Sequence, residues 1–230
     1  MLTGSLLNLA EALTAFVGLH FLLSHPLRQP VVRLVGEQGF RGLYALTALV
    51  TFIWIIFAYR EAPYAALWPQ LEGLRWPVNI VMVCASILVI GGFVAPNPFI
   101  QTMGPGLKGT PQVKGVFLIT RHPFMWGVGL WAVSHAAING DARTVMLTAG
   151  MAILALVGAA LQDAKLEHRL GATWRDFEAR TSFVPLGAML AGKARLADVG
   201  LKPLIAGLIL YALLAGGHPH FIGVRALPFF

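Results

Sequence analysis

Long apolar stretches constrain this chain more than any other feature of its sequence. No water bonds backbone N–H and C=O groups inside a bilayer, so a spanning segment must be a helix or part of a closed barrel. Apolar runs of about 20 residues are typical of spanning helices. Six stretches can be marked, at Leu6–Leu23, Phe40–Tyr59, Trp76–Ala95, Phe124–Ile138, Thr144–Leu161 and Pro203–Ala215. The fourth and sixth are short, so we expect them to extend into flanking residues or to tilt less.

The composition agrees with a membrane protein. Of the 230 residues, 57% are hydrophobic and only 12% are charged. That balance is far from the composition of a soluble domain. No internal repeat or low-complexity tract interrupts the chain. We therefore predict an all-α fold, a polytopic membrane helix bundle with about six transmembrane helices that forms a single integral membrane domain over residues 1–230.

The connectors between the stretches predict the orientation. With six spans, residues 24–39, 96–123 and 162–202 lie on one side, which holds 13 of the Lys and Arg residues when Arg41 is included. The opposite side holds four, which are Arg60, Arg75, Arg143 and Arg225. Positive residues accumulate in cytoplasmic connectors. We therefore expect the first side to be cytoplasmic and both termini to be periplasmic, in a bacterial inner membrane.

The excess of positive charge favours membrane lipids over nucleic acid as a partner. The net charge is +7 and the pI is near 10.1, and anionic headgroups on the cytoplasmic side are sufficient to account for both. The first stretch contains Glu11 and lacks the basic n-region and cleavage site of a signal peptide, so we expect a retained helix. Cys84 is the only cysteine, which excludes a disulfide framework or a CxxC site within one chain.

Two connectors carry patterns of their own. Residues 104–109 read GPGLKG and formally match GxGxxG, but they lack the preceding strand and following helix that a dinucleotide site requires. We expect a flexible loop there. Between residues 162 and 180, apolar residues recur at helical spacing among charged ones, which predicts an amphipathic helix in the membrane interface. These apolar residues are Leu166, Leu170, Trp174 and Phe177.

Two histidines lie inside apolar stretches, His20 in the first and His135 in the fourth. Pro123 suits the first turn of the fourth helix, in which one face carries Phe124, Val128, Trp131, His135 and Asn139. A histidine at hydrocarbon depth is costly unless it faces protein or a cofactor, so both are candidate functional residues. A hydrogen bond to a neighbouring helix is the alternative explanation. Iron porphyrin in a helix bundle takes imidazole ligands of this kind.

Three blocks of the sequence resemble the NnrU family, which is related to 15-cis-zeta-carotene isomerase. They are FVGLHFLLSHPLR at 16–28, VGEQGFRGLYALTAL at 35–49, and ITRHPFMWGVGLWAVSH with AINGD at 119–141. The resemblance implies an integral membrane protein that holds haem b. It implies either a cis–trans isomerase or a part in the nitric oxide and nitrite metabolism of denitrifying bacteria. The sequence leaves open whether the protein is an enzyme or a non-enzymatic haem protein, and whether it meets a long apolar substrate or nitric oxide.

The resemblance also implies iron ligands. In the isomerase branch two membrane histidines are proposed as axial ligands, and the motifs carry them to His20 and His135, with His25 as the alternative to the first. Where the isomerase has a cysteine three residues before the second histidine, this chain has Ala132. A thiolate ligand is therefore absent at that position.

Basic residues flank both histidine helices. We expect Arg28, Arg121 and His122 to hold polar or anionic groups such as haem propionates or lipid headgroups. If these arginines mark the cytoplasmic surface, a rise of about 1.5 Å per residue puts His20 and His135 about 8 Å apart in depth. One iron accepts both imidazoles at that offset only if the porphyrin is tilted.

A second resemblance supplies an alternative function. Arg121-His122-Pro123 followed by Gly127 is similar to the RHP-x-x-x-G pattern of isoprenylcysteine and phospholipid methyltransferases, which use S-adenosylmethionine. The acidic pair of those enzymes is incomplete, because His168 follows Glu167. Methyl transfer in the membrane is therefore the second interpretation.

Single cysteines test the predicted orientation. In a Cys84→Ser background, Arg225→Cys should react with a membrane-impermeant thiol reagent added outside intact cells, because its connector is expected to be periplasmic. Lys108→Cys should stay unlabelled until the membrane is permeabilised. Labelling of position 108 from outside would contradict the orientation.

Overall fold

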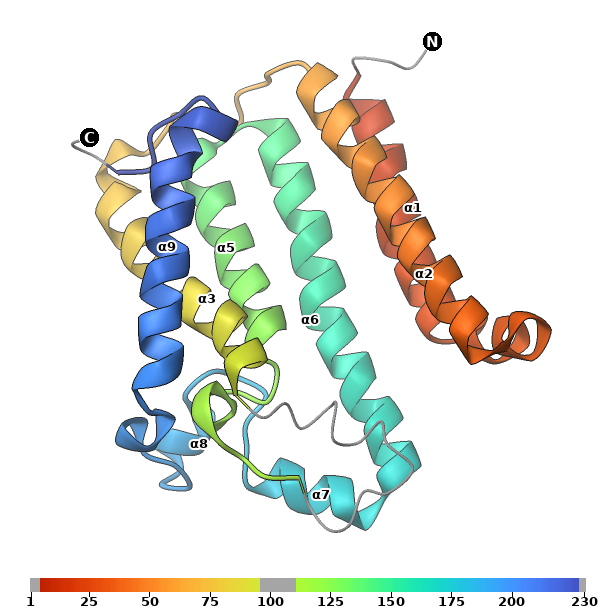
Figure 1. Cartoon of the computed structure of the whole chain (residues 1–230). Helices are drawn as coiled ribbons and strands as arrows, with labels where there is room; N and C mark the ends of the chain where they lie inside the picture. Colours follow the sequence, from red (N-terminus) through yellow and green to blue (C-terminus); the bar gives the residue numbers. More distant parts are fainter. Residues whose placement is uncertain (1–4, 96–110, 228–230) are drawn as a thin grey trace. The chain divides into compact units, whose positions relative to one another are not determined.

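A computed structural model describes residues 5–95 and 111–227. Within those ranges the α-helices are α1 (Leu6–Ser24), α2 (Arg28–Glu61), α3 (Arg75–Val94), α5 (Pro123–Asn139), α6 (Ala142–Leu170), α7 (Ala172–Ala179), α8 (Gly187–Leu190) and α9 (Leu201–Phe221) (Figure 1). The 3₁₀ turns are η1 (Glu72–Leu74), η2 (Gly115–Leu118) and η3 (Leu196–Val199). The glycine-rich loop at 104–109 and Lys108 lie outside the described residues.

Among the described residues, five helical segments are long and apolar enough to cross a membrane. They are α1, α2, η1 with α3, α6 and α9. α5 occupies the fourth apolar stretch and has 17 residues, one of the two short spans of the sequence. The other, α9, extends beyond the sixth stretch at both ends, as expected. The prediction of an all-α membrane helix bundle is confirmed.

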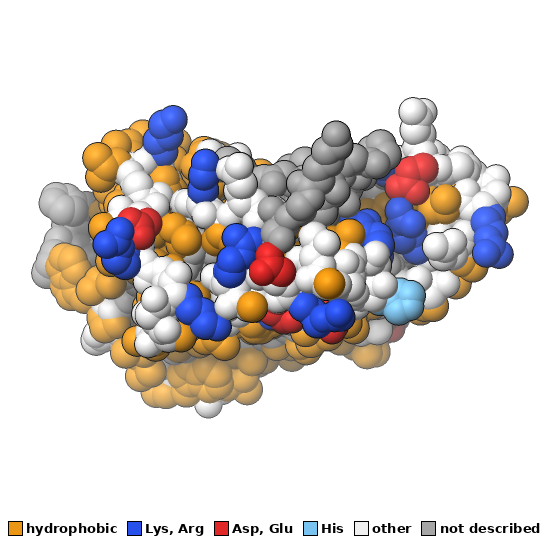
Figure 2. Space-filling view, turned by 90° about the horizontal axis from the view of Figure 1, so that it is seen from below, with side chains coloured by type: hydrophobic (Ala, Val, Ile, Leu, Met, Phe, Trp, Pro, Cys, Tyr) orange, Lys and Arg blue, Asp and Glu red, His pale blue; other side chains and the backbone are white. Residues whose placement is uncertain are grey.

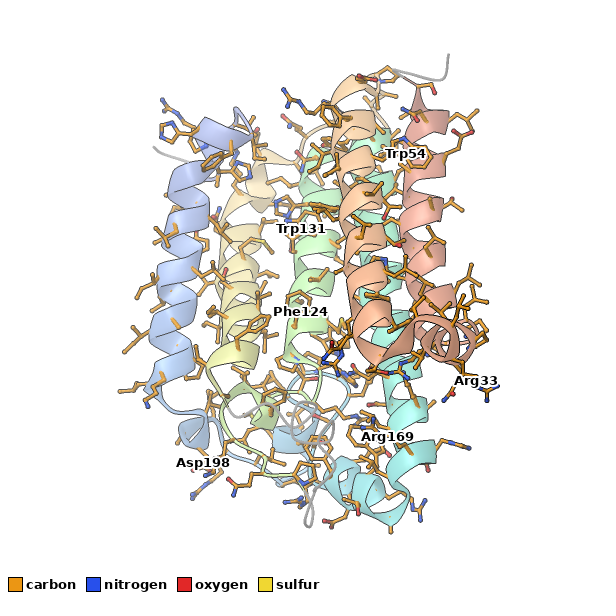
Figure 3. All side chains as sticks on the ribbon, turned by 45° about the vertical axis from the view of Figure 1, so that its right-hand side comes forward. Arg33, Trp54, Phe124, Trp131, Arg169 and Asp198 are labelled. Atoms are coloured by element: carbon orange, nitrogen blue, oxygen red, sulfur yellow. The ribbon has the colours of Figure 1, made fainter. Side chains whose placement is uncertain are left out.

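The chain forms two compact units. The first comprises residues 1–71 and 135–154, and the second comprises residues 72–134 and 155–230. In the first, α1 and α2 run side by side in opposite directions, and the indole of Trp54 on α2 donates to Asn8 Oδ1 on α1 at 3.0 Å (Figure 3). The buried residues of this unit's core are Leu9, Ala12, Leu13, Phe16, Ile55, Ala58 and Ala62.

α2 is broken near its beginning. Gly36 has φ 75° and ψ 168°, a conformation that glycine adopts readily and other residues rarely do. The helix therefore consists of a short part, residues 28–35, and a long part, residues 37–61. The sequence predicts a connector up to residue 39, whereas the structure has a helix over residues 28–35 of that connector.

The turn between α5 and α6 is fastened by the segment that follows α2. The carbonyl of Gly140 accepts from the backbone N–H of Leu67 at 2.7 Å and of Trp68 at 3.2 Å. The indole of Trp68 donates to the carbonyl of Ala137 at 3.1 Å. Gly140 has φ 62°, and its Cα lies directly against Trp68. A side chain at this position would have neither the conformational freedom nor the space it needs.

In the second unit α3 packs along α9. Gly207 of α9 lies so close to Ile87 of α3 that a methyl group would not fit between them. The Tyr211 hydroxyl donates to Asn79 Oδ1 at 2.6 Å, and Asn79 Nδ2 donates to the carbonyl of Ala226 at 3.1 Å. Small residues and shared hydrogen bonds are the usual means by which spanning helices associate.

The amphipathic helix predicted between residues 162 and 180 exists in two pieces. The end of α6 supplies the first piece and α7 supplies the second, with a break at Gly171, where φ is 52°. Trp174 and Phe177 are buried and pack with Leu166 and neighbouring apolar residues. The apolar face of this segment is therefore covered by protein rather than open to lipid.

Substitution of two glycines separates backbone strain from steric overlap. Gly140→Ala and Gly171→Ala both place a methyl group at positive φ, which costs about 1–2 kcal/mol. Gly140→Ala should cost about 2 kcal/mol more, because its Cβ would overlap Trp68 whereas Gly171 faces open space. Thermal unfolding in mild detergent measures the difference. Equal losses in the two variants would show that the contact with Trp68 does not hold the turn.

Candidate functional site

His20 lies one turn before the end of α1 and is fixed from several directions. Its Nδ1 is 2.6 Å from the carbonyl oxygen of Phe16. A carbonyl only accepts, so Nδ1 carries the proton, and in the neutral ring Nε2 carries the lone pair. The ring contacts Phe16 with a centroid separation of 4.3 Å and meets Tyr44 edge-on at 5.4 Å. In metal sites, a carbonyl that accepts from one ring nitrogen of a histidine fixes the tautomer, so that the other nitrogen binds the metal.

His25 caps the same helix. Its Nδ1 is 2.9 Å from Ser24 Oγ, and that hydroxyl donates to the carbonyl of His20 at 2.6 Å. Because the hydroxyl proton is used, His25 Nδ1 is the donor and Nε2 holds the lone pair. Nε2 is buried and has no hydrogen-bond partner among residues 5–95 and 111–227. His20 and His25 therefore both fit the chemistry of an iron ligand.

His135 is half-buried and lies one turn before the end of α5. The best-packed residues of α5 are small ones, namely Gly127, Gly129, Ala132 and Ser134. A Cβ on Gly127 would come within 2.9 Å of the Ala85 carbonyl on α3. Trp131, which lies one turn before His135 on the same helix (Figure 3), is half-buried as well.

His20 and His135 belong to the same unit but lie at different heights in it. Leu13 of α1 packs against Gly150 of α6, and His135 lies just ahead of the tight turn that leads into α6. Counting about 1.5 Å per residue from this contact puts His20 about 10 Å beyond it along α1 and His135 about 6 Å away on the other side, so the two histidines are roughly 16 Å apart along the axes. This offset exceeds the 8 Å expected from the sequence. One iron would accept both imidazoles only if the line joining them ran nearly parallel to the helix axes.

Arg28 is bound to a carboxylate of its own unit. One guanidinium nitrogen donates to both oxygens of Glu37, at 2.8 and 3.1 Å. The guanidinium carbon also lies 5.3 Å from the centroid of the Phe40 ring. Arg28 thus joins the short part of α2 to the long part across Gly36.

Arg121 and His122 meet two acidic residues in the second unit. Arg121 Nε donates to Asp163 Oδ2 at 2.7 Å, and Nη2 donates to Glu178 Oε1 at 2.6 Å. His122 Nε2 lies 2.7 Å from the other oxygen of Asp163. The side chains of Arg121, His122 and Asp163 are only 8%, 1% and 13% exposed. Removing one member of such a network would leave a buried charge without its partner.

Backbone contacts hold this ion network in place. The backbone N–H of Arg121 donates to the carbonyl of Ser182 at 2.9 Å, and Thr120 Oγ1 donates to the carbonyl of Phe183 at 2.6 Å. The Phe183 ring lies 5.4 Å from the His122 ring and 5.7 Å from the Arg121 guanidinium carbon. The network therefore ties the beginning of α5 to the segment after α7.

A small cavity adjoins His122. Its volume is about 210 Å³, and its wall is apolar apart from two polar side chains. The lining residues are Gly92, Phe93, Phe117, His122, Pro123, Phe124, Met125 and Gln162. The cavity suits an apolar group.

The candidate metal-binding side chains of the first unit are single imidazoles. Within the described ranges, no group of three or more His, Cys, Asp or Glu side chains is placed to hold a metal. A haem brings four nitrogen ligands of its own and needs only one or two from the protein. The imidazoles of the first unit therefore fit that group.

Sequence reasoning missed the acidic partners of the Arg-His-Pro motif. Asp163 and Glu178 lie 42 and 57 residues after Arg121, in a connector whose charge density is typical of a solvated surface. Tyr44, which contacts His20, is an ordinary aromatic residue of an apolar stretch. The periodicity of a single helix does not predict the contacts of Arg121 with these carboxylates or of His20 with Tyr44.

Comparison with known proteins gives a family and two relatives. A family profile described as NnrU protein matches residues 8–226. The chloroplastic 15-cis-zeta-carotene isomerase of Zea mays is 27% identical over 176 residues, which are 74% of this chain and 47% of that protein. The one of Arabidopsis thaliana is 28% identical over 169 residues, 70% of this chain and 44% of that protein. The chain spans about half the length of these curated relatives. No solved structure matches.

Removing the shared carboxylate tests the ion network. Asp163→Asn should destabilise the protein by about 3 kcal/mol, because the buried Arg121 would lose the more buried of its two anionic partners. Thermal unfolding in mild detergent should register the loss. Glu167→Gln is the matched control, since its exposed pairing with Arg175 at 3.9 Å contributes little. If both variants unfold at the wild-type temperature, the network does not secure α5.

Proposed function

The chain belongs to the NnrU family, and on that premise we propose a haem b-dependent membrane protein that catalyses cis–trans isomerisation of a long apolar polyene. The family match includes both intramembrane histidines and the Arg-His-Pro motif. The names of the two relatives supply the reaction class. The substrate class follows from the same names and from the membrane setting of the helices.

One observation carries the proposal, namely that the neutral imidazole of His20 is held in a single tautomer. The Phe16 carbonyl holds the proton on Nδ1 and leaves Nε2 as the ligand nitrogen. The Phe16 and Tyr44 rings limit rotation of the imidazole. Preorganisation of this kind lowers the cost of binding iron.

His135 is the proposed second axial ligand. It belongs to the same unit as His20 and is half-buried. His25 is the less suitable first ligand, because it stands one further turn along the chain from the level of His135. Ala132 is buried beside this site and offers no sulfur.

When bound, the haem would supply one-electron chemistry that the side chains of this chain lack. The protein's own residues would bind the haem, orient it and shield it from water. His20 and His135 would fix the position of the iron, and the apolar residues of the spanning helices would exclude water. Arg28 and Arg121 both bind carboxylates of this chain, so a propionate would have to share them.

The charge distribution supports a location for the reaction. We propose an inner-membrane protein whose basic connectors lie in the cytoplasm and whose termini are periplasmic. A polyene hydrocarbon dissolves in the bilayer, so it would reach the helices from the lipid phase. His135 lies one turn before the end of α5, so hydrocarbon would reach it most directly from the leaflet at that end of the helix.

Absorbance spectra of the purified protein test haem ligation. The wild type should show a Soret band that shifts on reduction and a six-coordinate low-spin spectrum, because two imidazoles fill both axial positions. His20→Ala and His135→Ala should each lose haem or become five-coordinate. His218→Ala is the control, because its imidazole bonds the Val224 carbonyl at the end of α9 and should not affect the spectrum.

Two results would contradict this ligand assignment. Loss of haem in His25→Ala together with an unchanged spectrum in His20→Ala would move the first ligand to His25. A thiolate-type spectrum in either redox state would exclude the histidine pair.

The isomerase activity needs its own measurement. Reduced wild-type protein incubated with a 15-cis polyene of the carotene type should convert it to the trans isomer, measured by chromatography, and His20→Ala should not. A haem-loaded wild type that leaves the polyene unchanged would disprove the isomerase. An open coordination position that binds carbon monoxide or nitric oxide would then favour the gas-handling role.

A further inference from the structure

The short part of α2, residues 28–35, has an exposed apolar face. Leu27, Val31, Leu34 and Val35 follow the i, i+4, i+7, i+8 spacing that puts side chains on one face of a helix. Leu34 is 84% exposed, and Leu27 and Val35 are also exposed. Gln29 and Arg33 fall on the opposite face. We call residues 27–35 the collar helix.

The collar helix is held in a defined orientation. Gly36 turns the chain sharply between it and the long part of α2. Arg28 then binds both oxygens of Glu37 and lies over the Phe40 ring, so it fastens the collar helix to the first turns of that long part. The exposed leucine is thus part of an ordered surface.

The position of the collar helix next to a spanning helix indicates that lipid covers its apolar face. The long part of α2 is apolar enough to span a membrane, so the collar helix begins where that span meets the headgroups. A helix with an apolar face and a basic face lies in this interface with its apolar side in the acyl boundary. Water would be an unfavourable surrounding for Leu34.

Charge identifies the preferred lipid. Residues 28–41 contain three arginines and one glutamate, a net charge of +2. Arg41 pairs with Glu37 at 3.5 Å but is 71% exposed, and Arg33 extends away from the helices in Figure 3. Lys and Arg side chains are also spread over the face shown in Figure 2. Each basic residue near an anionic membrane surface contributes about 1 kcal/mol.

We propose that the collar helix is a lipid-binding element that inserts Leu34 into the acyl boundary and binds anionic phospholipid headgroups through its Arg33, together with Arg41 on the first turns of the long part of α2. This inference does not depend on haem or on isomerisation. It requires only that α2 spans a membrane.

Spin labels on the two faces of the helix test the insertion. Leu34→Cys and Gln29→Cys, each in a Cys84→Ser background, would carry a nitroxide in protein reconstituted into phosphatidylcholine–phosphatidylglycerol vesicles. The label at 34 should be relaxed by dissolved oxygen and shielded from a water-soluble nickel chelate, and the label at 29 should show the reverse. Because Leu34 is on the surface, its replacement disturbs no packing. Equal access of the chelate to both labels would overturn the insertion.

Spin-labelled lipids test the headgroup preference. Arg33→Gln with Arg41→Gln should reduce the preference for phosphatidylglycerol over phosphatidylcholine about five-fold. Arg60→Gln with Arg225→Gln removes the same charge from the opposite connectors and serves as the control. An unchanged preference in the first pair, or an equal loss in both pairs, would overturn the assignment of the headgroup site to the collar helix.

Discussion

Polar side chains inside spanning helices must find hydrogen bonds without water, and three of them here find a backbone carbonyl one turn away. Thr51 Oγ1 donates to the Thr47 carbonyl, and Thr148 Oγ1 donates to the Thr144 carbonyl, both at 2.7 Å. His20 uses the same arrangement with the carbonyl four residues earlier. A hydroxyl satisfied in this way has no further donor, but an imidazole keeps a second nitrogen. The bond that makes His20 tolerable in a membrane helix also prepares Nε2 to accept a partner.

At the helix ends, arginines perform a different task. Arg28 and Arg121 each bind a carboxylate and approach a phenylalanine ring, in separate units of the protein. In both places the ion pair joins a spanning helix to a segment that does not span. The Arg121 network is buried, whereas the Arg28 pair is partly open to solvent, so the two differ in how much stability depends on them. Basic residues next to a membrane therefore serve protein structure as well as headgroups.

Local signals explain what the sequence could predict. Apolar runs locate the spans because burial in hydrocarbon depends on each segment by itself, and Pro123 marks the beginning of α5 because its ring suits a first helical turn. The collar helix was missed because a single glycine, Gly36, separates it from the span and the charged residues around it suggest a loop. The partners of Arg121 were missed because α6 continues to Leu170, beyond the apolar stretch that ends at Leu161. Contacts between residues so far apart in the chain produce no periodic pattern in the sequence.

The long separation between Arg121 and its partners has a consequence for biosynthesis. Arg121 leaves the ribosome 42 residues before Asp163 and 57 residues before Glu178. While α5 is entering the membrane, its guanidinium therefore has only water or lipid phosphate to neutralise it. The network can close only after α6 has been inserted and α7 has emerged on the same side. If α6 failed to insert, Arg121 could not bind Asp163 and the start of α5 would not be held in place. The ion network therefore forms only in a chain whose helices have been inserted in the correct order.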